Sequence, residues 1–383
     1  MSKHIPYGKQ YVNDDDIDAV VKALKSDFLT TGPLVKEFED RLAEYVGSKY
    51  AVVMSNGTAA LHAACYAAGI SEGDEVITTP LTFAASANCI LYLGAKPVFV
   101  DIDIETYNID VKQIESKITE KTKAIIPVHF GGISADMDTI HKIAEKYNLL
   151  VIEDAAHAIG TEYKGRKIGS LSDMTEFSFH PVKTITSGEG GAITTNSKEL
   201  YEKVKMFCTH GITRNEELML EDNGGWYYEQ QALGFNYRLT DIQSALGISQ
   251  LNRISGFISR RNEIVNRYNK AFSNCDGIKL QKDPQYSDTS RHLYIIQLNL
   301  ELLEISRREC YEKLREKNIG VNVHYIPVYY HPYYKKLGYE KGLCPVAENL
   351  YERIITLPLH PSMTNEDVDY VINSVTEIIE NRR

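Results

Sequence analysis

The stretch "TKAIIPVHFGGISADMDTIHKIAEKYNLLVIEDAA", residues 122–156, decides the fold that we expect for this chain. It begins with the apolar run "TKAIIPVHF", continues with the helical pattern "MDTIHKIAEKY" and returns to the apolar run "LLVIEDAA". Brief strands rich in Val and Ile that alternate with helices are typical of a mainly parallel sheet covered on both faces. The stretch therefore predicts a strand, a crossover helix and a second strand parallel to the first.

The same alternation extends on both sides of this stretch. Further strands are predicted at "YAVVMS", "DEVITTP", "KPVFVDID" and "AITTN", and two helices precede them, one capped by Asn13 and one closed by Gly47. Residues 240–272 predict an almost unbroken helix, after which shorter strands and helices follow. We expect a large α/β domain over residues 1–245, and a connecting helix with a small α+β domain over residues 246–383.

Composition narrows the class of protein. The chain has 383 residues, with 42 basic against 52 acidic side chains and a net charge of −10, which argues against a nucleic-acid surface. The six cysteines form no CxxC pair, so we expect reduced, mostly buried thiols and no metal site. No run approaches the roughly 18 apolar residues of a membrane span, so we expect a cytoplasmic protein without a membrane partner.

Two stretches at predicted strand ends carry candidate binding groups, because ligands of open α/β sheets bind beyond the carboxyl ends of the strands. In "MSNGTAAL", Gly57 and Thr58 at a helix start would suit a phosphate, although an ordinary helix cap explains them as well. In "LLVIEDAAHA", Asp154 could face a cationic ring nitrogen and His157 a ring oxygen. A simple helix cap is the alternative for Asp154.

The third stretch, "EFSFHPVKTITSGEGG" (residues 176–191), holds Lys183. Most lysines are solvated surface charges, but a lysine can also form a Schiff base with a carbonyl. Pyridoxal phosphate (PLP) calls for such a lysine, a carboxylate at its pyridine nitrogen and an anion cradle, and all three occur here in order. Phe83, in "PLTFAASAN", could stack on the cofactor ring or pack in the core. Together these motifs predict a PLP site.

With those motifs located, the sequence resembles the DegT/StrS family of sugar aminotransferases. The matching motifs are "NGTAAL", "ITTPLTFAASAN", "PVFVDID", "EDAAHAIGTEYKGRKIGSLSD", "FSFHPVKTITSGEGGAITT", "GFNYRLTDIQSALGISQL" and "VHYIPVYYHPYY", which together span essentially the whole chain. The resemblance implies the α/β fold of PLP-dependent transferases of fold type I, which is similar to aspartate aminotransferase. It also implies a homodimer with a shared active site.

The resemblance further implies a role for each matching residue. Lys183 would hold PLP as an internal aldimine and move a proton during catalysis, with pyridoxamine phosphate (PMP) formed in the half-reaction. The remaining implied contacts are Asp154 at the pyridine nitrogen, His157 at the ring hydroxyl, Gly57, Thr58 and Ser178 at the phosphate, Phe83 on the ring, and Asn236 reaching the phosphate of the neighbouring subunit.

Within the family the sequence is most similar to the aminotransferases of pseudaminic acid biosynthesis, and His180 in "SFHPVK" is one of the features that favour this subgroup. The implied reaction moves an amino group from L-glutamate to UDP-2-acetamido-2,6-dideoxy-β-L-arabino-hexos-4-ulose, giving UDP-4-amino-4,6-dideoxy-N-acetyl-β-L-altrosamine. Residues expected to line the nucleotide-sugar pocket are Tyr7, Asp27, Phe28, Leu29, Thr30, His324 and Tyr325. Ordinary loop and core packing explains them equally well.

Three alternatives stay open from the sequence. The first is another nucleotide-sugar 4-aminotransferase, of the perosamine or bacillosamine type. The second is a family dehydrase, but these enzymes carry histidine at the anchoring position, which is Lys183 here, and His180 lies three residues too early. The third is a regulator that keeps the fold without the chemistry. The retention of Lys183, Asp154 and Ser178 argues against it.

Overall fold

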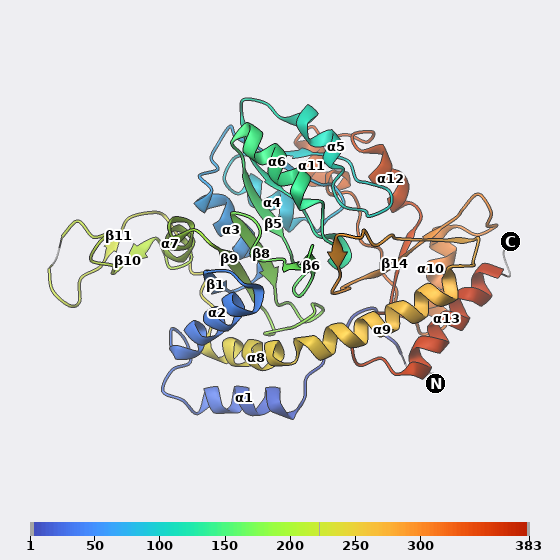
Figure 1. The fold of residues 1–383 in the computed structure, drawn as a ribbon, viewed down its shortest axis with the longest axis horizontal. Helices are drawn as coiled ribbons and strands as arrows, with labels where there is room; N and C mark the ends of the chain where they lie inside the picture. The colour runs from blue at the N-terminus through green and yellow to red at the C-terminus, as the bar shows by residue number, and fades with distance from the viewer. Residues whose placement is uncertain (1–3, 222, 381–383) are drawn as a thin grey trace.

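A seven-stranded sheet forms the centre of the molecule in the computed structural model, which describes residues 4–221 and 223–380 (Figure 1). The strands lie in the order β1 (Tyr50–Met54), β9 (Gly191–Thr195), β8 (Met174–Ser178), β5 (Leu150–Asp154), β4 (Thr122–Ile126), β2 (Glu75–Thr78) and β3 (Lys96–Phe99). The pairs from β8 to β3 are parallel, whereas β9 runs antiparallel to both of its neighbours. The predicted α/β class with a mainly parallel sheet is confirmed.

The strand, helix and strand predicted for residues 122–156 are present as β4, α6 (Met137–Tyr147) and β5. The helix α6 begins where the Asp136 side chain accepts a hydrogen bond from the amide of Thr139, and it ends at Asn148 in the left-handed conformation. β4 and β5 pair in parallel, with Ala124 opposite Leu150. The local sequence pattern is therefore sufficient to specify this crossover unit.

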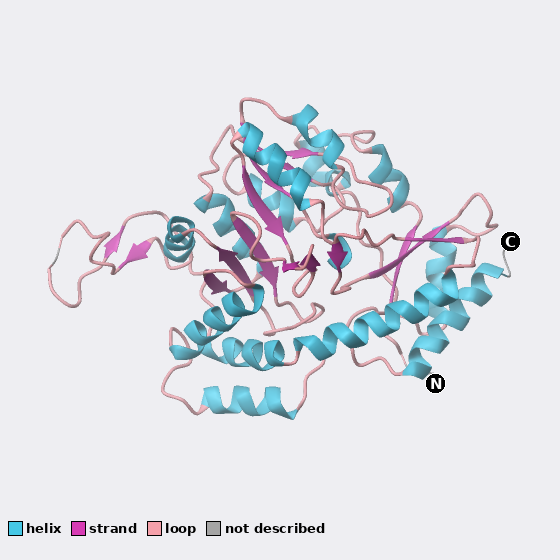
Figure 2. Cartoon of the chain, viewed as in Figure 1, coloured by secondary structure: helices cyan, strands magenta, loops and turns pink. Residues whose placement is uncertain are grey.

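Helices cover both faces of the central sheet (Figure 2). One face packs against α3 (Gly57–Ala67), α4 (Ala85–Leu91) and α7 (Lys198–Phe207), and the other against α2 (Pro33–Val46), α6 and the helices after residue 240. Side chains alternate between these faces along a strand. In β8, Met174 belongs to the α3 side and Phe177 to the α2 side, so Glu176 and Ser178 also point toward α3.

The long helix predicted for residues 240–272 is wrong at one point. The structure has two helices there, α8 (Asp241–Asn252) and α9 (Ile254–Phe272), which are separated at Arg253 with φ −108° and ψ 3°. The Arg253 guanidinium binds Asp16 of α1 (Asp14–Leu24), which lies along α8 (Figure 1). This contact joins segments that are more than 200 residues apart, so the local pattern could not reveal it.

A second apolar core lies in the C-terminal part of the chain. The antiparallel sheet of β12 (Ile278–Leu280), β14 (Tyr294–Leu298) and β15 (Ile354–Leu357) packs against α9, α10 (Arg307–Glu316) and α13 (Asn365–Glu380). Ile5 from the N-terminal arm is part of this core and forms a bridge with Ile319. The division of the chain at residue 245 falls inside α8 and stays a prediction, and the last three residues of the predicted C-terminal helix lie outside the described residues.

The remaining elements are short. They are α5 (Val111–Ile114), α11 (Pro332–Lys336), α12 (Pro345–Tyr351), the 3-10 turns η1 (Glu115–Lys117), η2 (Phe130–Gly132) and η3 (Val328–Tyr330), and the strands β6 (Glu162–Tyr163), β7 (Arg166–Lys167), β10 (Ile212–Thr213), β11 (Glu229–Gln230) and β13 (Ser287–Asp288). The β10 and β11 segment projects from the body of the molecule (Figure 1).

Two expectations drawn from composition can be compared with the structure. All six cysteines are free thiols, and all except Cys275 are buried, as expected. Over residues 4–221 and 223–380, no helix combines the length and the apolar character that crossing a membrane requires.

The Asp16 carboxylate provides a test of the packing between α1 and α8. It is fully buried and accepts hydrogen bonds from Ser249 Oγ at 2.6 Å and Gln250 Nε2 at 2.8 Å, in addition to the Arg253 guanidinium. Removing one partner of a buried ion pair leaves the other charge uncompensated, so Asp16→Ala should cost about 2–4 kcal/mol of folding free energy. We expect thermal unfolding, followed by circular dichroism, to show a midpoint lower by roughly 5 °C or more.

The matched control is Asp18→Ala, which removes an exposed carboxylate from the same helix. It should leave the unfolding midpoint within about 1 °C of the wild-type value, because exposed charges contribute little. Equal midpoints for the two variants would contradict the role given to Asp16.

Candidate active site

Lys183 and Asp154 meet where β8 and β5 end. Asp154 is the last residue of β5, and Lys183 follows β8 in a turn in which its backbone amide donates to the carbonyl of His180 at 2.9 Å. Burial lowers the pKa of the Lys183 amine, and the nearby carboxylates of Asp154 and Glu176 oppose that shift. Lys183, an amine of weakened basicity, and the acidic Asp154 therefore lie near each other, although they are 29 positions apart in the sequence.

The Asp154 carboxylate is held in a fixed orientation. It is 5% exposed, its Oδ2 accepts from Ser86 Oγ at 2.5 Å, and its Oδ1 accepts from the amide of Ala156 at 3.1 Å. Ser86 belongs to α4, so the helix after Phe83 supports a strand end of the sheet. A buried carboxylate fixed by donors favours a cation opposite its free lone pairs.

The N-terminus of α3 approaches the same strand ends. The intrahelical hydrogen bonds begin at Ala60, and the Asn56 side chain caps the amide of Ala59, which leaves Gly57 and Thr58 in the first turn, where amides have no intrahelical partner. A Cβ atom placed on Gly57 would lie 3.1 Å from Ser178 Cβ and 2.3 Å from Glu176 Oε1. A larger residue at position 57 would have to displace Glu176 and Ser178, and the free amides of the first turn suit an anion.

His157 lies in a group of neutral aromatic and imidazole side chains. The amide of Gly131 donates to His157 Nδ1 at 3.3 Å, so the neutral ring carries its proton on Nε2, which lies 3.1 Å from the Tyr325 hydroxyl. The rings of His157 and Tyr325 are nearly parallel, with an interplanar angle of 12°. The ring centroid of His292 lies 4.6 Å from that of His157. Burial and the Lys183 charge lower the pKa of His157 well below its ordinary value.

The C-terminal part of the chain contributes a second layer to the site. His324 is buried, its Nδ1 lies 2.9 Å from Thr356 Oγ1, and its ring is 5.4 Å from that of Tyr7. Burial together with Lys183 lowers the pKa of His324 to about 3. Tyr325 joins this group to His157. The structure therefore places three of the residues predicted for substrate binding next to the predicted cofactor residues.

Other predicted residues lie apart from this cluster. The segment Asp27 to Thr30 is exposed and lies against the start of α8, where the carbonyl of Leu29 accepts from the amide of Asp241 at 3.0 Å. Asn236 is exposed and forms a bridge with Thr209. Among the described residues, no hydrogen bond or ring contact joins either group to Lys183 within one chain. Their proposed roles therefore depend on substrate or on a second subunit.

Phe83 lies at the edge of the cluster. Its side chain is 63% exposed, and its ring lies 6.4 Å from that of Tyr325 at an angle of 54°. Core packing, the alternative considered from the sequence, does not account for such an exposed ring. A large exposed aromatic side chain beside a buried polar cluster is suited to stacking on a planar ligand.

Sequence reasoning missed two residues of the site. Ser86 lies in "TFAASAN" without any motif of its own, and only the packing of α4 against β5 brings it to Asp154. Glu176 stands within the quoted lysine stretch and was given no role. The sequence did contain a signal for Glu176, because residues two apart on a strand share a face. Glu176 is two residues before Ser178, so the alternation places it on the same side of the sheet.

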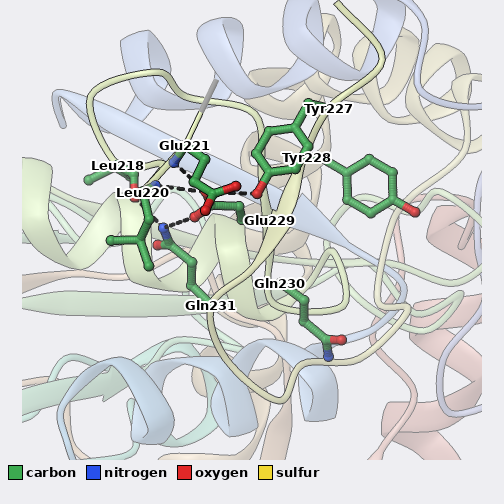
Figure 3. Close-up of a pocket in the computed structure, with 8 residues that line it drawn as sticks. All are labelled: Leu218, Leu220, Glu221, Tyr227, Tyr228, Glu229, Gln230 and Gln231. Carbon is green, nitrogen blue, oxygen red and sulfur yellow. Dashed lines mark hydrogen bonds between the residues drawn. The ribbon is translucent and has the colours of Figure 1, made fainter. Parts of the chain in front are cut away.

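A separate cavity of about 830 Å³ lies in the projecting β10 and β11 segment (Figure 3). The carboxylate of Glu229 lies among the residues that line this cavity. Its Oε1 atom accepts hydrogen bonds from the amides of Leu220 at 2.7 Å and Glu221 at 2.9 Å, and from the Tyr227 hydroxyl at 3.2 Å. These internal hydrogen bonds satisfy the carboxylate. None of the predicted site residues lines this cavity, so it is distinct from the cluster around Lys183.

The residues of the cluster fit PLP. The free amides at the start of α3 and the nearby Ser178 suit its phosphate, the oriented Asp154 suits its pyridine nitrogen, and the Lys183 amine suits its aldehyde.

Comparison with known proteins gives a consistent result. The model of the DegT/DnrJ/EryC1/StrS aminotransferase family matches residues 10–376. The chain is 44% identical to the spore coat polysaccharide biosynthesis protein SpsC of Bacillus subtilis, covering 98% of this chain and 97% of SpsC. It is 43% identical to a UDP-4-amino-4,6-dideoxy-N-acetyl-beta-L-altrosamine transaminase of Campylobacter jejuni, covering 98% of both chains.

Solved structures agree with the family match. Helicobacter pylori PseC, an aminotransferase involved in the biosynthesis of pseudoaminic acid, superposes with a TM-score of 0.92 at 33% identity, covering 99% of this chain and 100% of PseC. Spr1654 of Streptococcus pneumoniae, solved in a PLP form, gives a TM-score of 0.92 at 34% identity, covering 99% of each chain. The fold is therefore that of PLP-dependent aminotransferases.

The hydrogen bond from Ser86 to Asp154 yields a prediction about PLP binding. Ser86→Ala removes a donor to a buried carboxylate and loosens its orientation, and such contacts typically contribute about 1.5–3 kcal/mol. We expect the affinity of the cofactor-free protein for PLP to fall about tenfold, measured by fluorescence titration. The matched control, Ser244→Ala, removes a buried serine that donates to the backbone carbonyl of Thr240 in α8, and it should leave PLP affinity unchanged. Equal losses in both variants would contradict this role for Ser86.

Proposed function

The chain belongs to the DegT/DnrJ/EryC1/StrS aminotransferase family of PLP-dependent sugar aminotransferases, and from this premise we propose its substrates. The amino donor is L-glutamate, and the acceptor is C4 of UDP-2-acetamido-2,6-dideoxy-β-L-arabino-hexos-4-ulose. The product is UDP-4-amino-4,6-dideoxy-N-acetyl-β-L-altrosamine. The observation that carries this choice is the 43% identity, over 98% of both chains, to a transaminase named for that product.

The proposed cofactor site uses the residues grouped around Lys183. The amides of Gly57 and Thr58 and the hydroxyl of Ser178 would hold the phosphate, Asp154 the pyridine nitrogen, and His157 the ring hydroxyl. PLP, when bound, supplies an aldehyde that condenses with amines and a ring that withdraws electrons from the carbon losing a proton. Phe83 would cover one face of that ring and exclude water.

The chain's own side chains provide the acid and base chemistry. The partly buried Lys183 amine has a lowered pKa, so its nitrogen can accept a proton and return it more readily than an ordinary lysine. The Asp154 carboxylate, which is fixed by Ser86, would stabilise a positive charge at the ring nitrogen. The His157 ring holds its proton on Nε2 toward Tyr325, and the low pKa of its neighbour His324 keeps that imidazole neutral as well. Lys183 is then the main cation of the inner site.

The nucleotide-sugar pocket is proposed at the layer formed by Tyr7, His324 and Tyr325, with the segment Asp27 to Thr30 contributing from its exposed position. Aromatic and imidazole side chains offer stacking surfaces for a base and hydrogen bonds for a sugar or pyrophosphate. We further propose that Asn236, exposed in one subunit, completes the phosphate site of a second subunit in a homodimer. These positions extend the site beyond the cluster that one chain forms.

The substrate choice follows the relative whose name states a reaction product, because the name of SpsC, which is 44% identical, states none. A panel of UDP-linked and GDP-linked 4-keto-6-deoxy sugars with glutamate should give an amino sugar only from the proposed UDP substrate, as detected by mass spectrometry. Amination of a GDP-sugar alone would overturn the substrate and favour a perosamine-type enzyme.

The anchoring role of Lys183 predicts a spectroscopic difference. Wild-type protein loaded with PLP should change its visible absorbance when glutamate is added, whereas Lys183→Ala should show no covalent attachment of PLP after borohydride reduction and mass spectrometry. Lys167→Ala removes a lysine that lies over the Tyr45 ring, away from the cluster, and should behave as wild type. Reductive labelling of Lys183→Ala at wild-type levels would contradict the assignment.

The shared site predicts complementation between two defective variants. In a symmetric dimer, a mixed pair of Lys183→Ala and Asn236→Ala subunits contains one site with both wild-type residues and one site with both substitutions. Equal mixing followed by subunit exchange should therefore recover about a quarter of wild-type activity, measured at limiting PLP. Activity no greater than the mean of the separate variants would show that Asn236 acts within its own chain or not at all.

A further inference from the structure

Glu176 is a buried acid that the proposed reaction does not use. It lies on β8 two residues before Ser178, so the two side chains share the face that packs against α3. It pairs in register with Asp154 on β5 and with Ile193 on β9. Glu176 is therefore positioned between the proposed partner of the ring nitrogen and the proposed phosphate cradle.

The Glu176 carboxyl group has no compensating donor in the structure. The residue is 1% exposed, and no group in the described part of the chain donates a hydrogen bond to either of its carboxyl oxygens, while the Asp154 carboxyl group lies beside them. One of them, Oε1, would lie 2.3 Å from a Cβ atom on Gly57, so it faces the first turn of α3. A buried polar group without a partner is costly, and its position points to a ligand at the start of that helix.

The charged groups around Glu176 bear on its protonation. Asp154 from β5 repels a negative charge on Glu176, and Lys183 from the turn after β8 attracts one, while α3 presents the uncharged Gly57 and β9 presents Ile193. Burial and Asp154 together raise the pKa of Glu176 well above its ordinary value. A phosphate held at Gly57 would add a second anion beside it and favour the neutral acid further.

We propose that Glu176 binds the phosphate group of the cofactor as a neutral carboxylic acid, so that phosphate binding at the start of α3 takes up one proton on Glu176. This inference rests on the proposed cofactor site and adds a phosphate-binding residue to it. The proton comes from solvent, and no covalent bond changes. The phosphate then offers the O–H group of the acid a hydrogen-bond acceptor on the α3 side, in addition to the Asp154 carboxylate.

The sign of the pH dependence follows from this linkage. Bound phosphate raises the pKa of Glu176 above its value in the cofactor-free protein, so affinity is fully present below the cofactor-free pKa. Affinity then declines as pH rises through the interval between the two pKa values, by up to about tenfold per pH unit for one linked proton. Glu176→Gln keeps a neutral donor of the same shape, so its affinity should lack this component.

Calorimetric titration of cofactor-free protein in buffers of different ionisation enthalpy would test the proposal between about pH 6 and 9. The probes are PLP, inorganic phosphate, and pyridoxal without a phosphate. Wild type should take up more protons than Glu176→Gln with PLP and with inorganic phosphate, and the same number with pyridoxal. Protons that the phosphate itself binds or releases contribute equally in both proteins, so they cancel when the proton uptake of Glu176→Gln is subtracted from that of wild type.

Glu39→Gln is the matched control. Glu39 is also buried, burial raises its pKa to about 7, and it accepts from the amide of Val53 at 3.3 Å, on the opposite side of the sheet from α3. This variant should keep the wild-type proton uptake. If Glu176→Gln does not fold, infrared difference spectra of wild type supply a second test, because the band of a protonated carboxylic acid should persist to higher pH with phosphate bound than without it.

The outcomes separate this inference from the proposed function. Normal PLP binding with equal proton uptake in wild type and Glu176→Gln, or an infrared band that phosphate leaves unmoved, would overturn the role of Glu176 alone. A wild-type protein that binds neither PLP nor phosphate would overturn the proposed cofactor site and this inference with it.

Discussion

The pairing of β5 with β8 is the constraint on which the site depends. The parallel register sets Asp154 beside Glu176, and the strand alternation places Ser178 on the same face. That face is the one on which α3 packs, so the first turn of the helix reaches the strand ends. Glycine at position 57 allows this close approach without displacing the Glu176 and Ser178 side chains. One register therefore fixes the acidic group, the hydroxyl and the helix amides relative to each other.

The electrostatic balance of the site follows from that geometry. Asp154 and Glu176 are buried side by side, and two neighbouring buried acids favour having one of them protonated. The imidazoles of His157, His292 and His324 all have lowered pKa values, so they add no positive charge to the site. Lys183 faces this group as an amine of reduced basicity. In this arrangement the Lys183 amine and a bound ligand are the groups that can carry positive charge in the site.

The second half of the chain completes the site through long-range packing. Tyr325 reaches His157 because the C-terminal part packs beside the ends of the strands, and His324 lies against Tyr325. Arg261, buried in α9, donates to the carbonyls of His292 and Leu359. The N-terminal arm contributes as well, since the carbonyl of Tyr7 accepts from the amide of Leu359 at 3.0 Å. The site thus draws on the first, middle and last parts of the sequence.

The sequence by itself determined the main strands and helices, and it indicated a candidate site at the carboxyl ends of β5 and β8. Alternating apolar runs, the Asn13 cap and the Gly47 stop are local features, and the structure contains each of them. Motif resemblance also singled out Lys183, Asp154 and the start of α3 before any contact was known. The break at Arg253 and the support that Ser86 gives to Asp154 were decided only by tertiary structure. Both depend on contacts between distant segments, which local periodicity does not encode, and the protonation of Glu176 likewise depends on burial and on a neighbour from another strand.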